Sequence, residues 1–265
     1  MKIICIVKFV PDVDNIRYDF ENNTLDRSRV RLILNPDDVC AVSVALQIKD
    51  RDVDTSIEVV TMAPVSVKTY MEDLIRLGAD QATILCDKAF AGSDTYATSK
   101  VLAAYLEKQS YDLILTGTHA IDGDTSHIPA QVGAWLDLDQ ISGVTWVDTE
   151  GIDKRKAYFK VDKENEVIDF EVKLPAILSL SRESSYKLPY IKRTEIDRDV
   201  SQSLTFLNKE DLNISECETG DYGSLTKVVA THTREYQKKE CHFVRADEEG
   251  IETIFRFLEH KGFIE

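Results

Sequence analysis

A short loop in the middle of the chain carries residues that could hold a nucleotide. In the segment Asp112–Thr125, an apolar strand pattern runs into a small acidic loop that contains glycine. Open α/β sheets bind ligands at the carboxyl ends of their strands, and the free N–H groups at a helix start bind phosphate. Gly123 would let the backbone approach a ligand, and Thr125 would add a hydroxyl to those N–H groups. Nucleotide binding is one hypothesis for this loop, and a surface loop capped by Asp124 or Thr125 is the other.

Two other pairs of side chains could also do chemistry. His119 and His127 could bind a metal or act as an acid/base pair, but their spacing of eight matches no motif, so ordinary loop or helix-surface histidines are the preferred interpretation. Asp37 and Asp38 could act as paired carboxylates, although at a helix start two acids more simply complement the helix dipole. The sequence has no G-x-G-x-x-G, no nucleophile elbow and no recognisable cysteine nucleophile. We therefore predict no catalytic residue and no metal site.

The amino-acid composition limits the kinds of molecule that this protein is expected to bind. The 265 residues carry 32 Lys and Arg against 47 Asp and Glu, a net charge of −15, which disfavours nucleic acids and anionic membrane surfaces. The first apolar run is interrupted at Lys8, too early for a signal peptide or a membrane span. Five cysteines form no C-x-x-C pair and are predicted to be reduced thiols: Cys5, Cys40, Cys86, Cys217 and Cys241. These features predict a cytoplasmic protein that binds proteins or small molecules and does not insert into membranes.

The elements that would position the loop alternate along the first half of the chain. Short apolar runs predict strands at 3–10, 57–62, 82–86 and 113–116. Helices are predicted between them at 36–50, 67–77 and 94–108, with a further one around Gln131, Ala134 and Trp135. Asn35-Pro36 and Ser93-Asp94 are typical helix starts, and Gly78 is a typical stop. The alternation predicts an α/β fold with an open, mostly parallel twisted sheet and helices on both faces.

The pattern changes after Trp135. Further strands are predicted at 144–148, 157–161, 167–172 and 176–181, and polar turns between them indicate added antiparallel strands. Residues 183–240 are too polar to build a core of their own, and 246–260 form an amphipathic helix pattern with Ile251, Ile254, Phe255 and Leu258. We therefore predict an α/β domain over 1–182 and an extended C-terminal arm over 183–265.

Five short motifs in register resemble one known family. They are Val7–Asp12, Asn35–Asp38 with Ala41 and Ala45 on the following helix, Leu77–Asp80, Gly117–Thr125 and Leu174–Ile177. Over residues 1 to about 181 their order and spacing resemble the beta subunit of electron transfer flavoprotein. The resemblance implies an adenine-nucleotide-binding α/β domain, a partner alpha subunit that carries an electron-shuttling FAD, and an arm that packs on that partner.

The resemblance also implies a second nucleotide in this chain and the residues that would touch it. In the electron-bifurcating branch this nucleotide is FAD, which receives a hydride from NADH; in simple electron carriers it is AMP. Pro11-Asp12, Asp37-Asp38 and Gly123-Asp124-Thr125 are similar to the bifurcating pattern, whereas Phe9, His119 and His127 stand where that pattern more often has Gln. The residues implied to contact the nucleotide are Ile6, Asn35, Asp38, Met62, Ala120, Ile121, Asp122, Gly123, Asp124, Thr125, Ser126 and His127.

A second implied surface would recognise a flavin-dependent dehydrogenase. Residues 184–190, SSYKLPY, resemble the family's partner-recognition loop, with Tyr186, Leu188 and Pro189 as its contact residues and Leu188 as the docking residue. Two alternatives stay open at this point. One is a simple carrier with AMP in place of FAD, and the other is a stand-alone regulatory domain that binds ATP or AMP and has no flavin.

Overall fold

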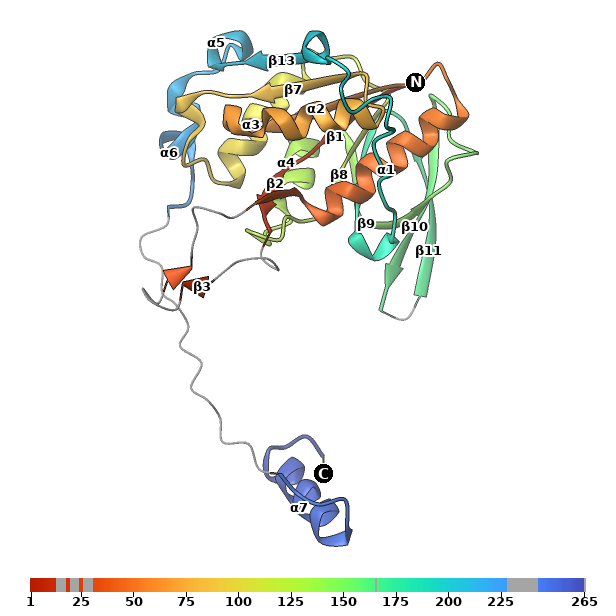
Figure 1. Ribbon diagram of the computed structural model, residues 1–265, viewed down its shortest axis with the longest axis vertical. Coiled ribbons are helices and arrows are strands. Elements are labelled where there is room, and N and C mark those ends of the chain that lie inside the picture. Colours follow the sequence, from red (N-terminus) through yellow and green to blue (C-terminus); the bar gives the residue numbers. More distant parts are fainter. Residues whose placement is uncertain (13–17, 20–23, 26–30, 165, 228–242, 265) are drawn as a thin grey trace. The chain divides into compact units, whose positions relative to one another are not determined.

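The computed structural model describes residues 1–12, 18–19, 24–25, 31–164, 166–227 and 243–264. Within these residues, contacts divide the chain into one compact unit, Met1–Lys227, and a second, Val228–Glu265. Figure 1 shows the first unit as a central sheet with helices packed against it. No helix among these residues combines the length and the apolar composition needed to cross a membrane.

The central sheet has nine strands in the order β11-β10-β9-β12-β8-β1-β6-β7-β13. Strands β9, β12, β8, β1, β6, β7 and β13 run parallel, and the β10–β11 hairpin is antiparallel. The strand bounds are β1 Lys2–Ile6, β6 Ser56–Met62, β7 Gln81–Leu85, β8 Leu113–Gly117, β9 Asp139–Val147, β10 Lys156–Lys163, β11 Glu166–Lys173, β12 Ala176–Leu180 and β13 Leu204–Leu207. The predicted mostly parallel sheet with added antiparallel strands is confirmed.

Helices cover both faces of this sheet because alternate strand residues point to opposite sides. Ile3 and Cys5 of β1 pack with residues of α1 (Pro36–Arg51) and α2 (Lys68–Leu77). Ile4 and Ile6 pack with residues of α3 (Thr95–Leu106) and α4 (His127–Leu136). The central strands β1, β8 and β12 are therefore buried on both sides, which explains their continuous apolar runs in the sequence. The predicted helices on both faces are confirmed.

Helix ends follow the local signals in two cases. The Asp94 side chain accepts the N–H of Ala97 and caps α3. Gly78 ends α2 with φ 133°, a value that favours glycine. Short helices complete the first unit: α5 Lys209–Leu212, α6 Gly220–Gly223, and the 3₁₀ turns Val65–Val67, Lys88–Phe90, Arg182–Ser184, Ser201–Ser203 and Glu216–Glu218.

One predicted strand is corrected by the sheet. The strand predicted at 3–10 is two strands, because β1 ends at Ile6 and β2 (Phe9–Pro11) pairs with β5 (Leu32–Leu34) in a separate sheet. The change of direction is fixed at Lys8, whose N–H is accepted by Asp38 and whose carbonyl accepts the N–H of Asn35. A further short pair, β3 (Tyr18–Asp19) and β4 (Thr24–Leu25), follows β2.

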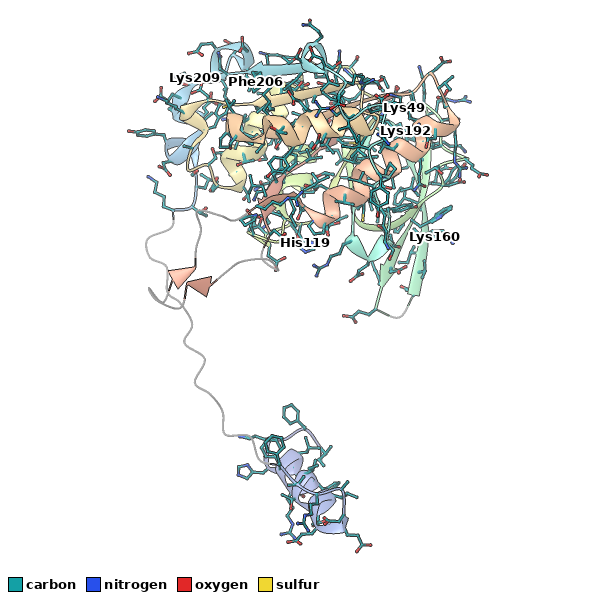
Figure 2. All side chains as sticks on the ribbon, viewed as in Figure 1. Lys49, His119, Lys160, Lys192, Phe206 and Lys209 are labelled. Carbon is teal, nitrogen blue, oxygen red and sulfur yellow. The ribbon has the colours of Figure 1, made fainter. Side chains whose placement is uncertain are left out.

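The segment predicted as an arm contributes to the first unit. Strand β13, on which Figure 2 labels Phe206, pairs in parallel with β7 at the edge of the sheet. The first compact unit therefore extends well past residue 182, and the packing of 183–265 on a partner stays a prediction. In the second unit, α7 (Glu248–His260) is capped by Asp247, and Ile251, Ile254 and Phe255 on it are exposed. Cys5, Cys40, Cys86 and Cys217 are free thiols, and Cys241 lies outside the described residues.

Candidate functional site

A cavity of about 360 Å³ lies at the carboxyl ends of the central strands. It opens beside β1 and β8, where the strand order reverses direction, since β6 and β7 continue on one side and β12 and β9 on the other. Ligands of open α/β sheets bind at such a reversal. Its walls come from the ends of β1, β6 and β8, the starts of α1, α3 and α4, and the loop 118–126. The lining residues are Ile6, Val7, Lys8, Asn35, Asp38, Met62, Ser93, Asp94, Thr95, Thr98, Leu102, Thr116, Gly117, Thr118, His119, Ala120, Gly123, Asp124, Thr125, Ser126, His127, Ile128 and Pro129.

Asp38 fastens the floor of the cavity. One carboxylate oxygen accepts the N–H of Lys8 at 2.7 Å, and the other accepts the N–H of Gly117 at 2.8 Å. The side chain is buried, and burial raises the pKa of Asp38 to about 7, although these two hydrogen bonds act in the opposite direction. Gly117 has to be small here, because a Cβ on it would collide with the Asp38 carboxylate and lie 2.7 Å from Cβ of Asp37.

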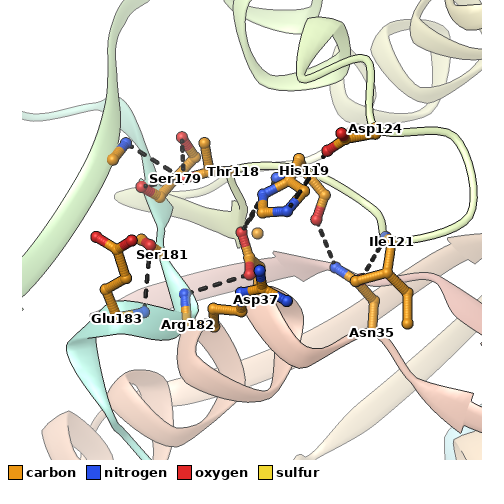
Figure 3. Close-up of polar contacts among 12 residues, drawn as sticks. Asn35, Asp37, Thr118, His119, Ile121, Asp124, Ser179, Ser181, Arg182 and Glu183 are labelled. Carbon is orange, nitrogen blue, oxygen red and sulfur yellow. Dashed lines mark hydrogen bonds and ion pairs between the residues drawn. The ribbon is translucent and has the colours of Figure 1, made fainter. Parts of the chain in front are cut away.

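Asn35 braces the cavity loop instead of capping its own helix. Its side-chain N–H donates to the carbonyl of His119 at 2.8 Å, and its side-chain oxygen accepts the N–H of Ile121 at 3.2 Å (Figure 3). No capping hydrogen bond from this side chain to α1 is present. The helix begins at Pro36 as predicted, but the side chain of Asn35 does not cap it. The amide is used by a loop more than 80 positions away, and a local pattern cannot show such a contact.

Asp37 and His119 form a close pair beside this brace. Nδ1 of His119 lies 2.8 Å from Oδ2 of Asp37, a fully buried carboxylate that also accepts the N–H groups of Arg182 and His119. Figure 3 shows the ring between Asp37 and Asp124. His119 lies in a loop, as expected of an ordinary loop histidine, but its ring is held by a buried acid, which the sequence did not predict. The simple dipole role predicted for Asp37 and Asp38 is incomplete, since both also bind loop and strand amides.

The second histidine joins two helix starts across the cavity. Nδ1 of His127, at the beginning of α4, lies 3.2 Å from the hydroxyl of Thr95, at the beginning of α3. Ser126 precedes α4 in a left-handed conformation with φ 54°, and no side-chain cap is made there. The first N–H groups of α4 therefore have no capping side chain, which suits an anionic ligand. Among the described residues, no group of His, Cys, Asp or Glu is arranged to hold a metal ion.

The structure brings together nearly all residues predicted to touch a nucleotide. All of them except Ile121 and Asp122 line the cavity. Ile121 and Asp122 have other partners: the N–H of Ile121 donates to Asn35, and the carboxylate of Asp122 pairs with Lys8 at 2.7 Å. That the set binds a nucleotide stays a prediction. The predicted set lacks the remaining lining residues, among them Lys8, Thr95 and Thr98. The helix start at Ser93-Asp94 was the signal in the sequence for the wall that Thr95 and Thr98 form.

The composition of the cavity wall is compatible with a cofactor site. A Cβ built on Gly123 meets no atom within 4 Å, so open space lies beside this backbone. Ile6, Met62 and Leu102 give apolar walls, and the α4 start gives N–H donors. An apolar wall with a few convergent polar groups is the usual composition of a cofactor site.

The residues predicted to recognise a dehydrogenase are placed unevenly. Tyr186 and Leu188 are half-buried and pack against the main core, whereas Pro189 is exposed and Tyr190 is 98% exposed. The backbone here is tied to α1, because the carbonyls of Tyr186 and Lys187 accept bonds from Cys40 and Ser43. Partner recognition by Tyr186, Leu188 and Pro189 stays a prediction.

Comparisons with known proteins agree with the geometry. The model of the electron transfer flavoprotein domain matches residues 22–195. The chain is similar to an electron transfer flavoprotein subunit beta of Thermoanaerobacterium thermosaccharolyticum, with 34% identity over 100% of both chains. It is also similar to the caffeyl-CoA reductase-Etf complex subunit CarD of Acetobacterium woodii, 36% identical over 86% of both chains. A third relative, the acryloyl-CoA reductase electron transfer subunit gamma of Anaerotignum propionicum, is 28% identical over 100% of both chains.

Proposed function

This chain belongs to the electron transfer flavoprotein family as a beta subunit, and we propose that it binds FAD in the cavity beside β1 and β8. In this proposal it pairs with an alpha subunit, takes electrons from NADH through the bound FAD, and divides them between the alpha-subunit FAD and a flavin-dependent dehydrogenase. The chain is then an electron-transfer component and not a complete enzyme.

One observation carries the proposal. The cavity at the reversal of strand order is lined by most of the residues implied to hold the nucleotide, its loop is held by Asn35 and Asp37, and Asp38 fixes Gly117 at the end of β8. Side chains at one helix start therefore keep the loop and its donors in place before a ligand arrives. Such preorganisation lowers the entropic cost of binding.

Different residues of the cavity would contact different parts of the bound nucleotide. Thr125, Ser126 and the first N–H groups of α4 would hold phosphate, and Ile6 and Met62 would contact the flat, apolar parts of the nucleotide. Gly123 would leave room for the ligand next to the loop backbone. A bound flavin supplies the exchange of one or two electrons, and the protein contributes orientation, exclusion of water and local charge.

Two further observations support the bifurcating role and the partners. The chain carries Asp37-Asp38 and Gly123-Asp124-Thr125, which are similar to the bifurcating pattern. Two relatives are named as parts of caffeyl-CoA and acryloyl-CoA reductases, so a dehydrogenase that acts on an acyl-CoA is the proposed class of partner. The arm from 183 onward is proposed to pack on the alpha subunit, and a cytoplasmic location is proposed from the free thiols.

A simple carrier with AMP is the second candidate, and one contact favours it. Phe9 packs on Tyr70 with ring centroids 5.3 Å apart, which places an aromatic pair where the bifurcating pattern more often has a polar Gln. Anaerobic titration of the purified heterodimer with NADH separates the two candidates. Flavin bleaching by NADH is expected for the bifurcating subunit and would be absent from a simple carrier.

The nucleotide site is tested by a matched pair of substitutions. Gly123→Tyr should empty the site by filling the space beside the loop, whereas Gly123→Ala should keep its nucleotide, since its added methyl has no neighbour within 4 Å. The measurement is the nucleotide released from each purified heterodimer on denaturation. Equal nucleotide content in the two variants would refute this location of the site.

A further inference from the structure

The Asp37–His119 pair fixes which ring nitrogen of His119 is available to a ligand. A buried carboxylate can only accept at Nδ1, so Nδ1 carries a proton and Nε2 is the atom left for other partners. Nε2 lies 3.6 Å from Oδ1 of Asp124, which is longer than a hydrogen bond. His119 itself lines the cavity, beside Ala120. The ring is thus held in one orientation. Its Nε2 makes no hydrogen bond to a described residue but lies within ion-pair distance of the exposed Asp124, which a phosphate would have to displace from a protonated ring.

Most charged residues that line the cavity are acidic, so the charge of the His119 ring affects how well an anionic ligand binds. Lys8 is the only lysine or arginine among the described residues that line the cavity, and it is already paired with Asp122. Three carboxylates also line the cavity: Asp38 from α1, Asp94 before α3 and Asp124 from the loop. A phosphate would therefore enter a site where acids outnumber bases. Histidine can change this balance, because it is the side chain whose charge ordinarily changes between pH 5 and 8.

We propose that Nε2 of His119 donates to a phosphate oxygen of the bound nucleotide when the ring is protonated, so that phosphate binding in this chain strengthens as the pH falls. This inference rests on the proposed nucleotide site and adds a positioning and specificity residue to it. Glutamine, which the bifurcating pattern more often has at this position, would donate at any pH. The histidine therefore makes the hold on the phosphate depend on pH.

Other titratable groups near the His119 ring could also make anion binding depend on pH, so the experiment needs controls for them. They are Asp37 and Asp38 on α1, Asp124 on the loop, and the Lys8–Asp122 pair; His127 and Asp94 lie at the starts of α4 and α3. Protonation of Asp38 would also favour an anion at low pH. Only a substitution at His119 isolates the contribution of the imidazole to the pH dependence of binding. Asp38→Asn measures how much of that pH dependence comes from Asp38.

The test is calorimetric titration of the full chain with two probes at pH 8.0, 7.0, 6.0 and 5.5. ADP-ribose carries phosphate diesters, whose charge stays constant over this range, and adenosine carries no phosphate. The wild type should bind ADP-ribose about tenfold more tightly at pH 5.5 than at pH 8.0, since the neutral ring keeps its proton on Nδ1 and cannot donate from Nε2, whereas the protonated ring donates from a charged group. Adenosine affinity should change little.

Variants complete the experiment. His119→Gln should lose most of the gain for ADP-ribose at low pH, and His260→Gln on α7, outside the first compact unit, should keep it. An unchanged pH dependence in H119Q overturns the inference alone, as does an equal pH dependence for adenosine and ADP-ribose in the wild type. If H119Q does not fold, D38N decides the question: a gain for ADP-ribose at low pH that disappears in D38N belongs to Asp38 and overturns the inference, whereas a gain that persists in D38N supports it. Absence of ADP-ribose binding at every pH overturns the proposed site and this inference with it.

Discussion

Asp38 and Gly117 are joined by a hydrogen bond of 2.8 Å, although they lie 79 positions apart in the chain. The other oxygen of Asp38 binds the N–H of Lys8, just after β1. One buried carboxylate therefore fastens the start of α1 to the carboxyl ends of two neighbouring parallel strands. These three points define the floor of the cavity, so changes at either residue should alter both stability and nucleotide binding.

Gly117→Ala should destabilise the protein. The added methyl would collide with the Asp38 carboxylate and approach the Asp38 backbone N at 2.9 Å, and overpacking of this kind costs about 1–3 kcal/mol in the free energy of unfolding. Urea unfolding measures the change. Gly123→Ala is the control, because its methyl has open space, and its effect should stay within about 1 kcal/mol. Equal stability of wild type and G117A would contradict this view of the floor.

Asp38 should make stability depend on pH near neutrality. Burial raises the pKa of Asp38 to about 7 from its ordinary value of 3.8, so ionisation of the folded protein costs free energy. That cost is fully present above pH 7, shrinks as the pH falls below 7, and is gone near pH 4. The free energy of unfolding should therefore rise by up to about 2 kcal/mol between pH 7 and pH 5.

Asp38→Asn supplies the comparison for this pH effect. The variant should lose stability at pH 5, because Asn cannot accept at its N–H₂ and leaves one of two buried backbone donors without a partner. Its stability should also change less between pH 7 and pH 5. Asp87 and Asp94 do not obscure the comparison, since hydrogen bonds hold the pKa of each below 3.8 and their effect appears only in stronger acid. An equal rise in both proteins would assign the effect to other groups.

Local signals predicted the elements well where a residue acts on its own neighbours. The cap at Asp94 and the stop at Gly78 depend on atoms within a few positions, and both occur as predicted. Strand β13 was missed because its four residues, Leu204–Leu207, become a strand only by pairing with β7, more than 100 positions earlier. The run 3–10 was predicted as one strand because its apolar pattern is continuous, although a distant carboxylate, Asp38, binds the N–H of Lys8.

Asn35→Ala should loosen the cavity loop without unfolding the sheet. The change removes two hydrogen bonds and leaves the N–H of Ile121 and the carbonyl of His119 without their partner, at a cost of about 1–3 kcal/mol. Hydrogen exchange should show faster exchange at the Ile121 amide, and nucleotide affinity should fall. The amide of Ile4 in β1, a fully buried strand residue, serves as the internal control. Unchanged exchange at Ile121 would mean that the brace does not hold the loop.

Leu188 and Tyr190 should separate packing from recognition. Leu188→Ala should lower the free energy of unfolding by about 1–2 kcal/mol, because its half-buried side chain packs on the main core. Tyr190→Ala should leave stability within about 0.5 kcal/mol, since the ring is 98% exposed, and should slow electron transfer to the dehydrogenase. Urea unfolding and the rate of dehydrogenase-linked dye reduction measure the two effects. A stable L188A would contradict the packing, and an unimpaired Y190A would remove the ring from the docking surface.

The sequence predicted residues that line the cavity more completely than the residues that support its loop. Family-like motifs identified the loop residues that line the cavity, because these motifs are contiguous in sequence. The bonds from Asn35 to the loop and from Asp37 to His119 join positions more than 80 apart, and neither follows from a local pattern. Their residue types also fit simpler helix-start roles, which explains why the sequence favoured those roles.

The central claim, a beta subunit with its own FAD, is tested most directly by counting nucleotides. The chain is co-expressed with its alpha subunit, the purified heterodimer is denatured, and the released nucleotides are separated and quantified by chromatography. Two FAD per heterodimer is the result that the proposed function predicts, and Gly123→Tyr should then release one. One FAD with one AMP would contradict the bifurcating role and identify a simple carrier, and a complex without flavin would contradict the proposed function altogether.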